Sequence, residues 1–350
     1  MGVEEDLESF DRLGAWPIIF QKLQNKSRYK AEEFSLRAAK DPLNIHLNRY
    51  RDVAPYDHSR ILLKEGETDY INASLVEGSA LVMPASDDDG VAKKEASPDF
   101  ALPMEPSQYR RYILTQGPLQ TTACHFWQMV WEQNSLAIIM LNKVMEKGVT
   151  KCAQYWPNGK VNYDHDSYLF EETGFKVTLL QQDEERFFTV RRFLLEYLPT
   201  GASREVLHFH YTAWPDFGVP DSPAAFLHFL LAVRQSGALD QHVGPPIVHC
   251  SAGIGRSGTF CLVDSALVQI EAKKNLNVVN VTELLIHMRR FRMGLIQTFD
   301  QLRFSYVAII EGGRRLLQNR FSLEELASGH DMEEDEDAEE DFDQSYSDDE

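Results

Sequence analysis

A cysteine and an arginine six positions apart are the residues of this sequence whose types and spacing are best suited to chemistry. Cys250 follows an apolar run and opens a loop of small residues that Arg256 closes. Gly253 and Gly255 let the backbone turn inward, so that successive N–H groups can point at one centre in front of the following helix. Such a loop binds anions. A cysteine at its start therefore suggests a site where a thiolate meets a phosphate.

The setting of Cys250 favours the thiolate over the thiol, because loop N–H groups, a helix N-terminus and Arg256 all stabilise negative charge. Arg256 adds a planar fork that matches two phosphate oxygens, which a lysine could not do. The alternative is a small buried hydrophobic residue, as we expect for Cys124 and Cys261 on apolar helical stretches. Since a thiolate is oxidisable, we expect peroxide to inactivate the protein reversibly through Cys250.

An attacking thiolate also needs an acid that protonates the leaving oxygen, and Asp216 is the candidate. It lies in YTAWPDFGVP (residues 211–220), where the prolines and the glycine indicate a loop. Trp214 and Phe217 are candidate hydrophobic latches, and a loop acid can swing onto bound substrate and exclude water. The alternative is an aspartate that stabilises a turn.

The second half-reaction would hydrolyse a cysteinyl phosphate and needs a positioned water. Gln297 in GLIQTFDQL is the candidate to hold that water through its amide. Ser257, next to Arg256, is a candidate hydrogen-bond donor to the departing thiolate. The alternatives are a polar residue at a helix N-terminus for Gln297 and simple helix capping for Ser257.

The composition fits one large domain or two ordinary ones, with 350 residues of which 43% are hydrophobic. The formal net charge is −19, but residues 331–350 hold 13 acids and no Lys or Arg, which leaves −6 for residues 1–330. No basic stripe stands out. We therefore expect no nucleic-acid partner.

The four cysteines show no metal-ligand spacing and no clustering with histidines, so we expect neither a metal nor another cofactor. A disulfide framework is improbable in a chain this long, which fits a reducing compartment. The N-terminal residues lack the apolar core of a signal peptide, and no run reaches the ~18 apolar residues of a membrane span. We expect a cytoplasmic monomer, with nuclear or membrane-associated pools as alternatives.

The N-terminal part of the chain has the pattern of a helix followed by irregular chain and strands. Apolar residues in 3–24 have helical spacing, with a break near Pro17. Residues 25–45 mix charges with short apolar groups, which predicts a segment of extended chain that makes an excursion away from the helices and strands. A polar loop at 48–63 leads into a strand, and 69–76 is strand-like.

The remainder alternates strands and helices. Strand patterns occupy 111–119, 136–141, the run before Cys250 and stretches between 174 and 212 that look antiparallel. Helical patterns cover 121–134, 222–237, the segment after Arg256, 281–292 and 298–318. Mixed strands in the middle and helices at both ends suggest one α+β domain around a mixed sheet.

Two segments differ from this domain in composition. Residues 77–109 contain four prolines and an acidic cluster, and predict a flexible surface insertion that either has no function or is a docking element. Residues 319–350 predict a disordered acidic tail. We therefore expect a folded domain over 1–318, interrupted by the insertion and followed by the tail.

The loop and several further motifs together resemble one family. HCSAGIGRSG is similar to the Cys-x5-Arg signature of the protein tyrosine phosphatases, and other family motifs occur in family order over about residues 48–310: NRYRDVAPYDHSR, DYINAS, YILTQGP, FWQMVWEQ, KCAQYWP, HYTAWPDFGVP and GLIQT. The sequences of these motifs are most similar to those of the non-receptor type 1 and T-cell (type 2) subfamily. The resemblance implies a highly twisted mixed sheet flanked by helices and a metal-independent phosphatase.

The resemblance also implies roles for individual residues. Cys250 resembles the nucleophile that forms the phosphocysteine, Asp216 the general acid that later acts as base, and Gln297 the water-positioning glutamine, with Gln301 one turn on. The phosphate cradle that the signature implies consists of Ser251, Ala252, Gly253, Ile254, Gly255 and Arg256, with His249 immediately before the nucleophile.

Further matches concern the rim of the pocket. Tyr50 resembles the aromatic wall that makes the pocket deep, so that phosphoserine and phosphothreonine would not reach Cys250. Arg51 resembles a contact for acidic flanking residues, and Asp52 the residue that grips the substrate backbone. Supporting roles are implied for Glu146, which would orient Arg256, and for Lys151, a partner of the Asp216 loop.

The implied substrates are phosphotyrosine-containing proteins, such as receptor or cytosolic tyrosine kinases and their substrates. One alternative is a binding module that captures phosphotyrosine without hydrolysis, but Cys250, Asp216 and Arg256 are all present. Another is a Cys-x5-Arg enzyme for phosphoserine or a phosphoinositide, against which the NRYRD loop argues.

Three departures from the type 1-like pattern stand out. The insertion at 77–109 is longer than usual, and Gln24 occupies the place of an arginine that, with Arg289, would form a secondary phosphotyrosine site. The chain ends in acidic residues where tail-anchored members carry an apolar segment. Tyr346 lies among these acids, so the tail is either a solvated segment or one that lies across the basic rim and slows substrate entry.

Overall fold

The computed structural model describes residues 2–78, 110–159, 166–215, 218–240 and 242–322. Two of the sequence-predicted site residues, Asp216 and Phe217, lie outside these ranges. So do almost all of the predicted insertion and the predicted acidic tail, including Tyr346.

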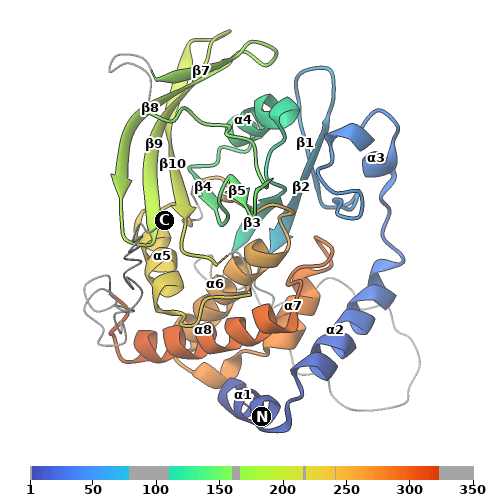
Figure 1. Cartoon of the computed structure of the whole chain (residues 1–350), viewed down its shortest axis with the longest axis vertical. Helices are drawn as coiled ribbons and strands as arrows, with labels where there is room; N and C mark the ends of the chain where they lie inside the picture. Colours follow the sequence, from blue (N-terminus) through green and yellow to red (C-terminus); the bar gives the residue numbers. More distant parts are fainter. Residues whose placement is uncertain (1, 79–109, 160–165, 216–217, 241, 323–350) are drawn as a thin grey trace, which may run out of the picture.

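A nine-stranded mixed sheet forms the centre of the molecule (Figure 1). Strand β11 pairs in parallel with β3 and β4, β4 pairs in parallel with β10, and all other neighbours are antiparallel. The prediction of a mixed sheet is therefore confirmed. From edge to edge the strands are β1 (Arg60–Leu62), β2 (Tyr70–Glu77), β3 (Arg111–Thr115), β11 (Ile247–His249), β4 (Ala137–Met140), β10 (Ala202–Tyr211), β9 (Phe188–Tyr197), β8 (Phe175–Glu184) and β7 (Ser167–Phe170), and a separate hairpin pairs β5 (Met145–Glu146) with β6 (Val149–Thr150).

The central strands are apolar on both faces and separate two hydrophobic cores. Successive residues of a strand point to opposite sides. In β4, Ile139 contributes to one core while Ile138 and Met140 contribute to the other. In β11, Val248 and Ile247 divide in the same way. The strand that leads to Cys250 is thus fixed from both sides.

Helices cover both faces of the sheet unequally. Most of them pack on one core, and Figure 1 shows α6, α7 and α8 gathered beneath the strands with α1 and α2 outside them. The other core contains α4 (Ala123–Glu132). The helices of the larger side are α1 (Val3–Leu13), α2 (Trp16–Ala31), α5 (Ala224–Gln235), α6 (Gly255–Lys273), α7 (Val281–Met288) and α8 (Phe299–Leu317).

The N-terminal helical pattern is confirmed, and the break that the sequence predicts near Pro17 lies at Gly14. Gly14 has φ 56° and caps α1 in the left-handed conformation, which glycine adopts without a steric penalty. Pro17 stands in the first turn of α2, where its missing N–H costs no hydrogen bond.

The prediction of an extended excursion over 25–45 is wrong. Helix α2 continues to Ala31, and a short helix α3 (Arg37–Lys40) and a 3₁₀ helix (Ile45–Leu47) follow. The Lys and Arg residues in the second half of α2 are good helix formers, and their charges are as compatible with a solvated helix as with a loop. The pattern predicted through 292 also ends early, since α7 stops at Met288.

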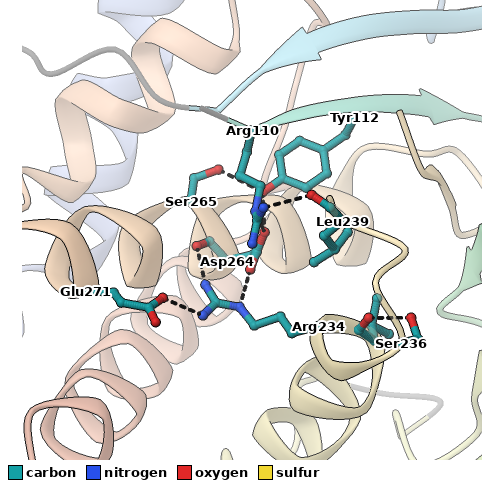
Figure 2. Close-up of polar contacts among 9 residues, drawn as sticks. Arg110, Tyr112, Arg234, Ser236, Leu239, Asp264, Ser265 and Glu271 are labelled. Carbon is teal, nitrogen blue, oxygen red and sulfur yellow. Dashed lines mark hydrogen bonds and ion pairs between the residues drawn. The ribbon is translucent and has the colours of Figure 1, made fainter. Parts of the chain in front are cut away.

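A buried ionic cluster joins three distant segments around Asp264, which lies on α6 and is fully buried (Figure 2). Its carboxylate accepts hydrogen bonds from Arg234 Nε at 2.6 Å, Arg110 Nε at 3.1 Å and the Tyr112 hydroxyl at 2.6 Å. Burial alone would raise the pKa of Asp264, but the two guanidinium groups outweigh it and the pKa is lowered. Glu271 receives a further bond from Arg234 at 3.3 Å.

The chain leaves β2 and returns to β3 at one point. The Gly78 N–H donates to the Arg110 carbonyl at 2.9 Å, directly beyond the Glu77–Arg111 pair of the two strands. A Cβ on Gly78 would lie 2.1 Å from the Ser265 hydroxyl, so the backbone there runs against α6.

Among the described residues, no helix is both long and apolar enough to cross a membrane.

Candidate active site

The Cys250 loop joins the central strand β11 to the N-terminus of α6, as the sequence predicts. Because β11 is parallel to both of its neighbours, its carboxyl end lies at the edge where ligands of parallel sheets bind. Cys250 itself is 5% exposed and lines a pocket of about 650 Å³.

The carbonyl groups of the loop all point away from that pocket. Each carbonyl from position 250 to 254 accepts a hydrogen bond from a group on the outer side of the loop. The donors are His249 Nδ1 to Cys250 at 3.1 Å, Gly117 N to Ser251 at 2.9 Å, Arg292 Nη2 to Ala252 at 3.1 Å, Arg292 Nε to Gly253 at 2.9 Å and Ile296 N to Ile254 at 3.0 Å.

This arrangement turns the loop N–H groups inward. In a trans peptide the C=O and the N–H point in opposite directions, so an outward carbonyl sends the next N–H into the loop. The N–H groups of Ser251, Ala252 and Gly253 make no hydrogen bond to another described residue. Unpaired N–H groups that converge at a helix N-terminus form an anion site.

Two glycines allow the loop to pack this tightly. Gly253 has φ 72°, and a Cβ there would lie 2.1 Å from the Thr115 carbonyl oxygen. A Cβ on Gly255 would lie 2.5 Å from Gln297 Oε1. The first glycine permits close approach to β3, and the second keeps the glutamine beside the cradle.

Arg292 supports the loop and was not singled out from the sequence. It is fully buried, and it also donates to Ser74 Oγ at 3.1 Å and Asn72 Oδ1 at 2.9 Å. Burial lowers its pKa to about 10. No local pattern distinguishes Arg292 from the neighbouring arginines, so only the folded contacts identify it.

Arg256 is held from behind by a carboxylate. Its Nη1 and Nη2 donate to Glu146 Oε1 and Oε2 at 2.6 and 3.1 Å, and Nη1 also donates to the Leu141 carbonyl at 3.1 Å. The Lys143 N–H in turn holds Glu146 at 3.1 Å. The contact expected between Glu146 and Arg256 is present.

One edge of the Arg256 guanidinium remains available. The Nε–H and the second Nη2–H have no acceptor among the described residues, and Arg256 lines the pocket. These two donors lie on the same edge of the planar group, which is the geometry that binds two oxygens of one phosphate. The Trp214 ring lies 5.6 Å from the guanidinium carbon and covers it.

The pocket brings together most of the residues that the sequence predicts. Of the predicted residues, it is lined by Tyr50, Arg51, Asp52, Glu146, Lys151, Trp214, Cys250, Ser251, Ala252, Arg256, Gln297 and Gln301. Gly253, Ile254 and Gly255 are buried in the loop wall behind it. Sequence reasoning missed Asn142, Val53, Thr298 and Asp300, which also line it.

Two consecutive hydrogen bonds hold the Tyr50 side chain at the rim of the pocket. The Ser251 hydroxyl donates to the Lys151 carbonyl at 3.0 Å, so it accepts from the Tyr50 hydroxyl, whose oxygen is 2.7 Å away. Arg49 and Gln116 also tie the rim segment to the end of β3. Neither was predicted, because their partners are backbone groups about 70 positions away.

Gln297 follows a strained position. Ile296 has φ 64°, which is rare for a β-branched residue, and two hydrogen bonds hold it there, one to the Ile254 carbonyl and one from Arg289. The Gln297 N–H then donates to Gln301 Oε1 at 2.9 Å. The surrounding contacts thus place Gln297 at the pocket wall.

Ser257 is fully buried, and its hydroxyl has no hydrogen-bond partner among the described residues. An unpaired buried hydroxyl is costly, so a partner that arrives with the reaction would explain it. This favours the donor role over simple capping, which would occupy the hydroxyl.

The other three cysteines do not line the Cys250 pocket. All four are free thiols. Burial raises the pKa of Cys124 to about 11 and that of Cys152 to about 12, and burial also raises the pKa of Cys261 well above its ordinary value. Their raised pKa values favour the protonated thiol, as expected for Cys124 and Cys261 as hydrophobic residues. The reaction of peroxide with Cys250 stays a prediction.

Gln24 and Arg289 meet beside a second pocket. Arg289 Nη1 donates to Gln24 Oε1 at 3.0 Å and to Ser27 Oγ at 3.3 Å, while Nε and Nη2 donate to the Leu295 and Ile296 carbonyls. Gln24 therefore occupies a donor of Arg289 and adds no second positive charge. The sequence-based expectation that a secondary phosphotyrosine site lacks one of its two arginines here stays a prediction.

Comparisons with known proteins agree with this geometry. The family model described as protein-tyrosine phosphatase matches residues 44–311. The chain is 48% identical over 312 residues to the tyrosine-protein phosphatase non-receptor type 2 of Homo sapiens, which covers 89% of this chain and 66% of that protein. It is 50% identical over 287 residues to the tyrosine-protein phosphatase non-receptor type 61F of Drosophila melanogaster, with 82% and 46% covered.

A receptor-type relative is more distant. The chain is 38% identical over 284 residues to the receptor-type tyrosine-protein phosphatase S of Gallus gallus, which covers 80% of this chain and 16% of that protein. The chain belongs to the protein-tyrosine phosphatase family. It spans about two thirds or less of the length of these curated relatives.

Proposed function

We propose that this protein hydrolyses phosphotyrosine in proteins through a cysteinyl-phosphate intermediate. The observation that carries the proposal is the loop around Cys250, whose five outward carbonyls leave inward N–H groups beside the open edge of Arg256. Such an anion site with a cysteine at its base fits the transfer of a phosphoryl group to sulfur.

In the first step the Cys250 thiolate attacks phosphorus and the bond to the phenol oxygen breaks. The loop N–H groups and Arg256 stabilise the charge on the phosphoryl oxygens, and this positive field replaces a metal ion. Asp216 gives its proton to the leaving oxygen. The ends of its loop are linked, because Trp214 Nε1 donates to the Gly218 carbonyl at 3.2 Å.

In the second step water attacks phosphorus and the sulfur leaves as a thiolate. Asp216, now ionised, takes a proton from the water that Gln297 orients. The Ser257 hydroxyl donates to the departing sulfur, which supplies the partner that the hydroxyl otherwise lacks. Inorganic phosphate is released and the thiolate is restored.

Selectivity for phosphotyrosine follows from the rim. Tyr50 is fixed upright by Ser251, so the phosphate must reach Cys250 past an aromatic wall, which a short serine or threonine side chain does not do. Arg51 and Asp52 line the same mouth, where they suit acidic flanking residues and the peptide backbone of a substrate.

The wider context belongs to the same proposal. We infer a catalytic domain over 1–318, supported by α8 ending at Leu317, with an insertion at 77–109 and an acidic tail over 319–350. Four free thiols fit a cytoplasmic location. The substrates would be phosphotyrosine proteins, such as receptor or cytosolic tyrosine kinases and their substrates, and the enzyme would act as a monomer.

The test is hydrolysis of a phosphotyrosyl peptide in the presence of a chelator. The wild type releases phosphate, Cys250→Ser abolishes turnover, and Asp216→Ala slows turnover and retains bound peptide. Cys124→Ser, a change at another buried thiol, keeps activity. Turnover by Cys250→Ser at the wild-type rate would overturn the mechanism, and equal rates on a phosphoseryl peptide would overturn the selectivity.

A further inference from the structure

Three buried histidines and a tyrosine form a connected group behind the Cys250 loop. His208 and His210 lie on β10, and His249 ends β11. The Tyr155 hydroxyl lies 2.9 Å from His208 Nε2 and 2.7 Å from His249 Nε2. Arg191, on β9, places Nη1 at 3.4 Å from His208 Nδ1 and 3.3 Å from His210 Nδ1.

The direction of every hydrogen bond follows from the Cys250 end of this group. The Cys250 carbonyl can only accept, so His249 Nδ1 carries a hydrogen and donates to it at 3.1 Å. In a neutral ring His249 Nε2 is then an acceptor, and the Tyr155 hydroxyl must donate to it. The Tyr155 oxygen therefore accepts from His208 Nε2–H, which leaves His208 Nδ1 as an acceptor in need of a donor.

Arg191 supplies that donor. Starting from Arg191, at the other end of the chain of hydrogen bonds, the same donor and acceptor atoms follow. A guanidinium has no acceptor atom, so any ring nitrogen that faces it must accept. His208 Nδ1 faces Arg191, which puts the hydrogen of His208 on Nε2 and sends the chain forward to His249. The two ends of the chain are chemically unrelated, yet they require the same tautomers.

A second branch reaches the segment that seats Arg256. His210 Nε2 lies 2.8 Å from the Asn142 carbonyl, which can only accept, so His210 also carries its hydrogen on Nε2. Its Nδ1 again faces Arg191. Asn142 follows Leu141, whose carbonyl binds Arg256, so this branch supports the arginine as the first supports the cysteine.

The three rings are neutral, which the assignment requires. Burial lowers the pKa of His208 well below its ordinary value, that of His210 to about 4 and that of His249 to about 3. A neutral imidazole has one N–H, so fixing one nitrogen fixes the other.

We propose that Arg191 is a positioning residue that sets the tautomers of His208 and His210 and, through Tyr155, His249 and Asn142, holds the Cys250 carbonyl and the seat of Arg256. The inference rests on the proposed function for its kinetic part only. Nη1 carries two hydrogens, one for each histidine, while Nε donates to Gln182 Oε1 at 2.7 Å and the guanidinium lies 5.3 Å from the Trp156 ring. These contacts fix Arg191 without contact to the substrate pocket.

The experiment measures the ¹⁵N chemical shifts of the histidine rings in the full chain together with kcat and KM for a phosphotyrosyl peptide. The wild type should show hydrogen on Nε2 of His208 and His210 and on Nδ1 of His249. In Arg191→Gln, whose amide oxygen can accept, the signals of His208 and His210 should divide between two tautomers. We expect kcat to fall by up to about 10²-fold with little change in KM.

Two further variants separate positioning from general stability. Tyr155→Phe should release His249 while His208 and His210 keep their Nε2 hydrogens, and Arg191→Lys, which also only donates, should restore much of kcat. The matched control is Arg192→Gln, at the next position of β9, where the side chain is about half exposed and pairs with Glu205. It should change neither the tautomers nor kcat.

The proposal fails if His249 carries its hydrogen on Nε2 in the wild type, or if Arg191→Gln leaves the tautomers of His208 and His210 and kcat unchanged. The tautomers are measured without substrate. If the wild type hydrolysed no phosphotyrosine, the proposed function would fail, and the ring signals would still decide whether Arg191 sets the tautomers.

Discussion

Two arginine–carboxylate groups in this protein have opposite designs. At Asp264 the carboxylate is at the centre, and Arg110 and Arg234 surround it in the interior (Figure 2). At the Cys250 loop Arg256 is at the centre, and Glu146 binds it from one end only. The first group satisfies its buried charge within the fold, while the second leaves two donors facing a pocket.

The difference shows how the same chemistry serves stability in one place and binding in another. A buried charge that loses its partner is strongly destabilising, so the Asp264 group must remain complete. The Arg256 group tolerates an incomplete set of partners because its free edge is reached by solvent or by an anion. Substitutions in the two groups should therefore affect different measurements.

The largest expected effect is on stability at Asp264. Replacement by asparagine leaves two arginines without their buried counter-charge and should lower the free energy of unfolding by about 3–5 kcal/mol, measured by urea denaturation. The kcat of the folded fraction should stay within about twofold, since no residue of this group lines the pocket.

Glu271→Gln is the matched control for that change, because Glu271 receives a bond from the same Arg234 but is 51% exposed at its side chain. It should cost between 0 and about 1 kcal/mol. If it cost as much as Asp264→Asn, burial would not be what distinguishes the two carboxylates.

Arg256→Lys should give the reverse result. Lysine keeps the charge but cannot offer two parallel donors, so kcat on a phosphotyrosyl peptide should fall by about 10²–10³-fold. The free energy of unfolding should change little. Arg234→Lys is the counterpart, and it should lower stability while kcat is retained. A large loss of stability in Arg256→Lys would contradict the comparison.

Acidification should destabilise the histidine group behind the Cys250 loop and the Asp264 group in different pH ranges. The pKa values of His208, His210 and His249 are lowered by burial, so below about pH 6.5 the unfolded chain binds protons that the folded one does not, and stability falls as pH falls. The loss should be on the order of 1 kcal/mol per histidine per pH unit.

The contribution of Asp264 has a different pH window. Its pKa is lowered in the folded state, so its stabilising effect is complete above the unfolded value near 4 and is lost only as pH falls through the folded value. The difference in stability between the wild type and Asp264→Asn should therefore stay constant from pH 7 to 5. A difference that shrinks over this range would contradict the lowered pKa.

The smallest effect that we predict on activity concerns Glu146→Gln. One acceptor oxygen remains for Arg256, but the charge and the second bond are lost, so kcat/KM should fall by about 10-fold. Stability should change by less than it does in Asp264→Asn, because Arg256 can still be solvated from the pocket. An unchanged kcat/KM would show that Leu141 alone seats the arginine.

The sequence predicts the strand, loop and helix around Cys250 because hydrophobic periodicity and glycine placement are local signals. It also places Glu146 and Tyr50 through family resemblance. It cannot find the groups that bind the loop carbonyls, since Gly117, Arg292 and Ile296 are brought there by other strands and helices. Any exposed arginine or ordinary glycine has the same local pattern.

The wrong prediction for residues 25–45 and the failure to predict the Arg191–histidine group also arise because the sequence shows only local patterns. The mixed charges of 25–45 conceal three helical segments whose polar face is solvated, and composition alone does not separate this from a loop. The histidines of β10 alternate with apolar residues as in any strand, and Arg191 of β9 stands next to a second arginine, Arg192, from which the sequence does not distinguish it. Only the pairing of β9 with β10 brings them behind the Cys250 loop.

The hydrogen bond between Gly78 and Arg110 closes the sheet at the point where the chain leaves β2 and returns to β3. Because the two residues are hydrogen-bonded and Arg110 is anchored to Asp264, a two-residue hairpin could replace residues 79–109 without moving either strand. Such a shortening would relieve about 2 kcal/mol of loop-closure entropy. The same junction is a site where a foreign peptide or a small reporter domain could be grafted while the catalytic pocket keeps its shape.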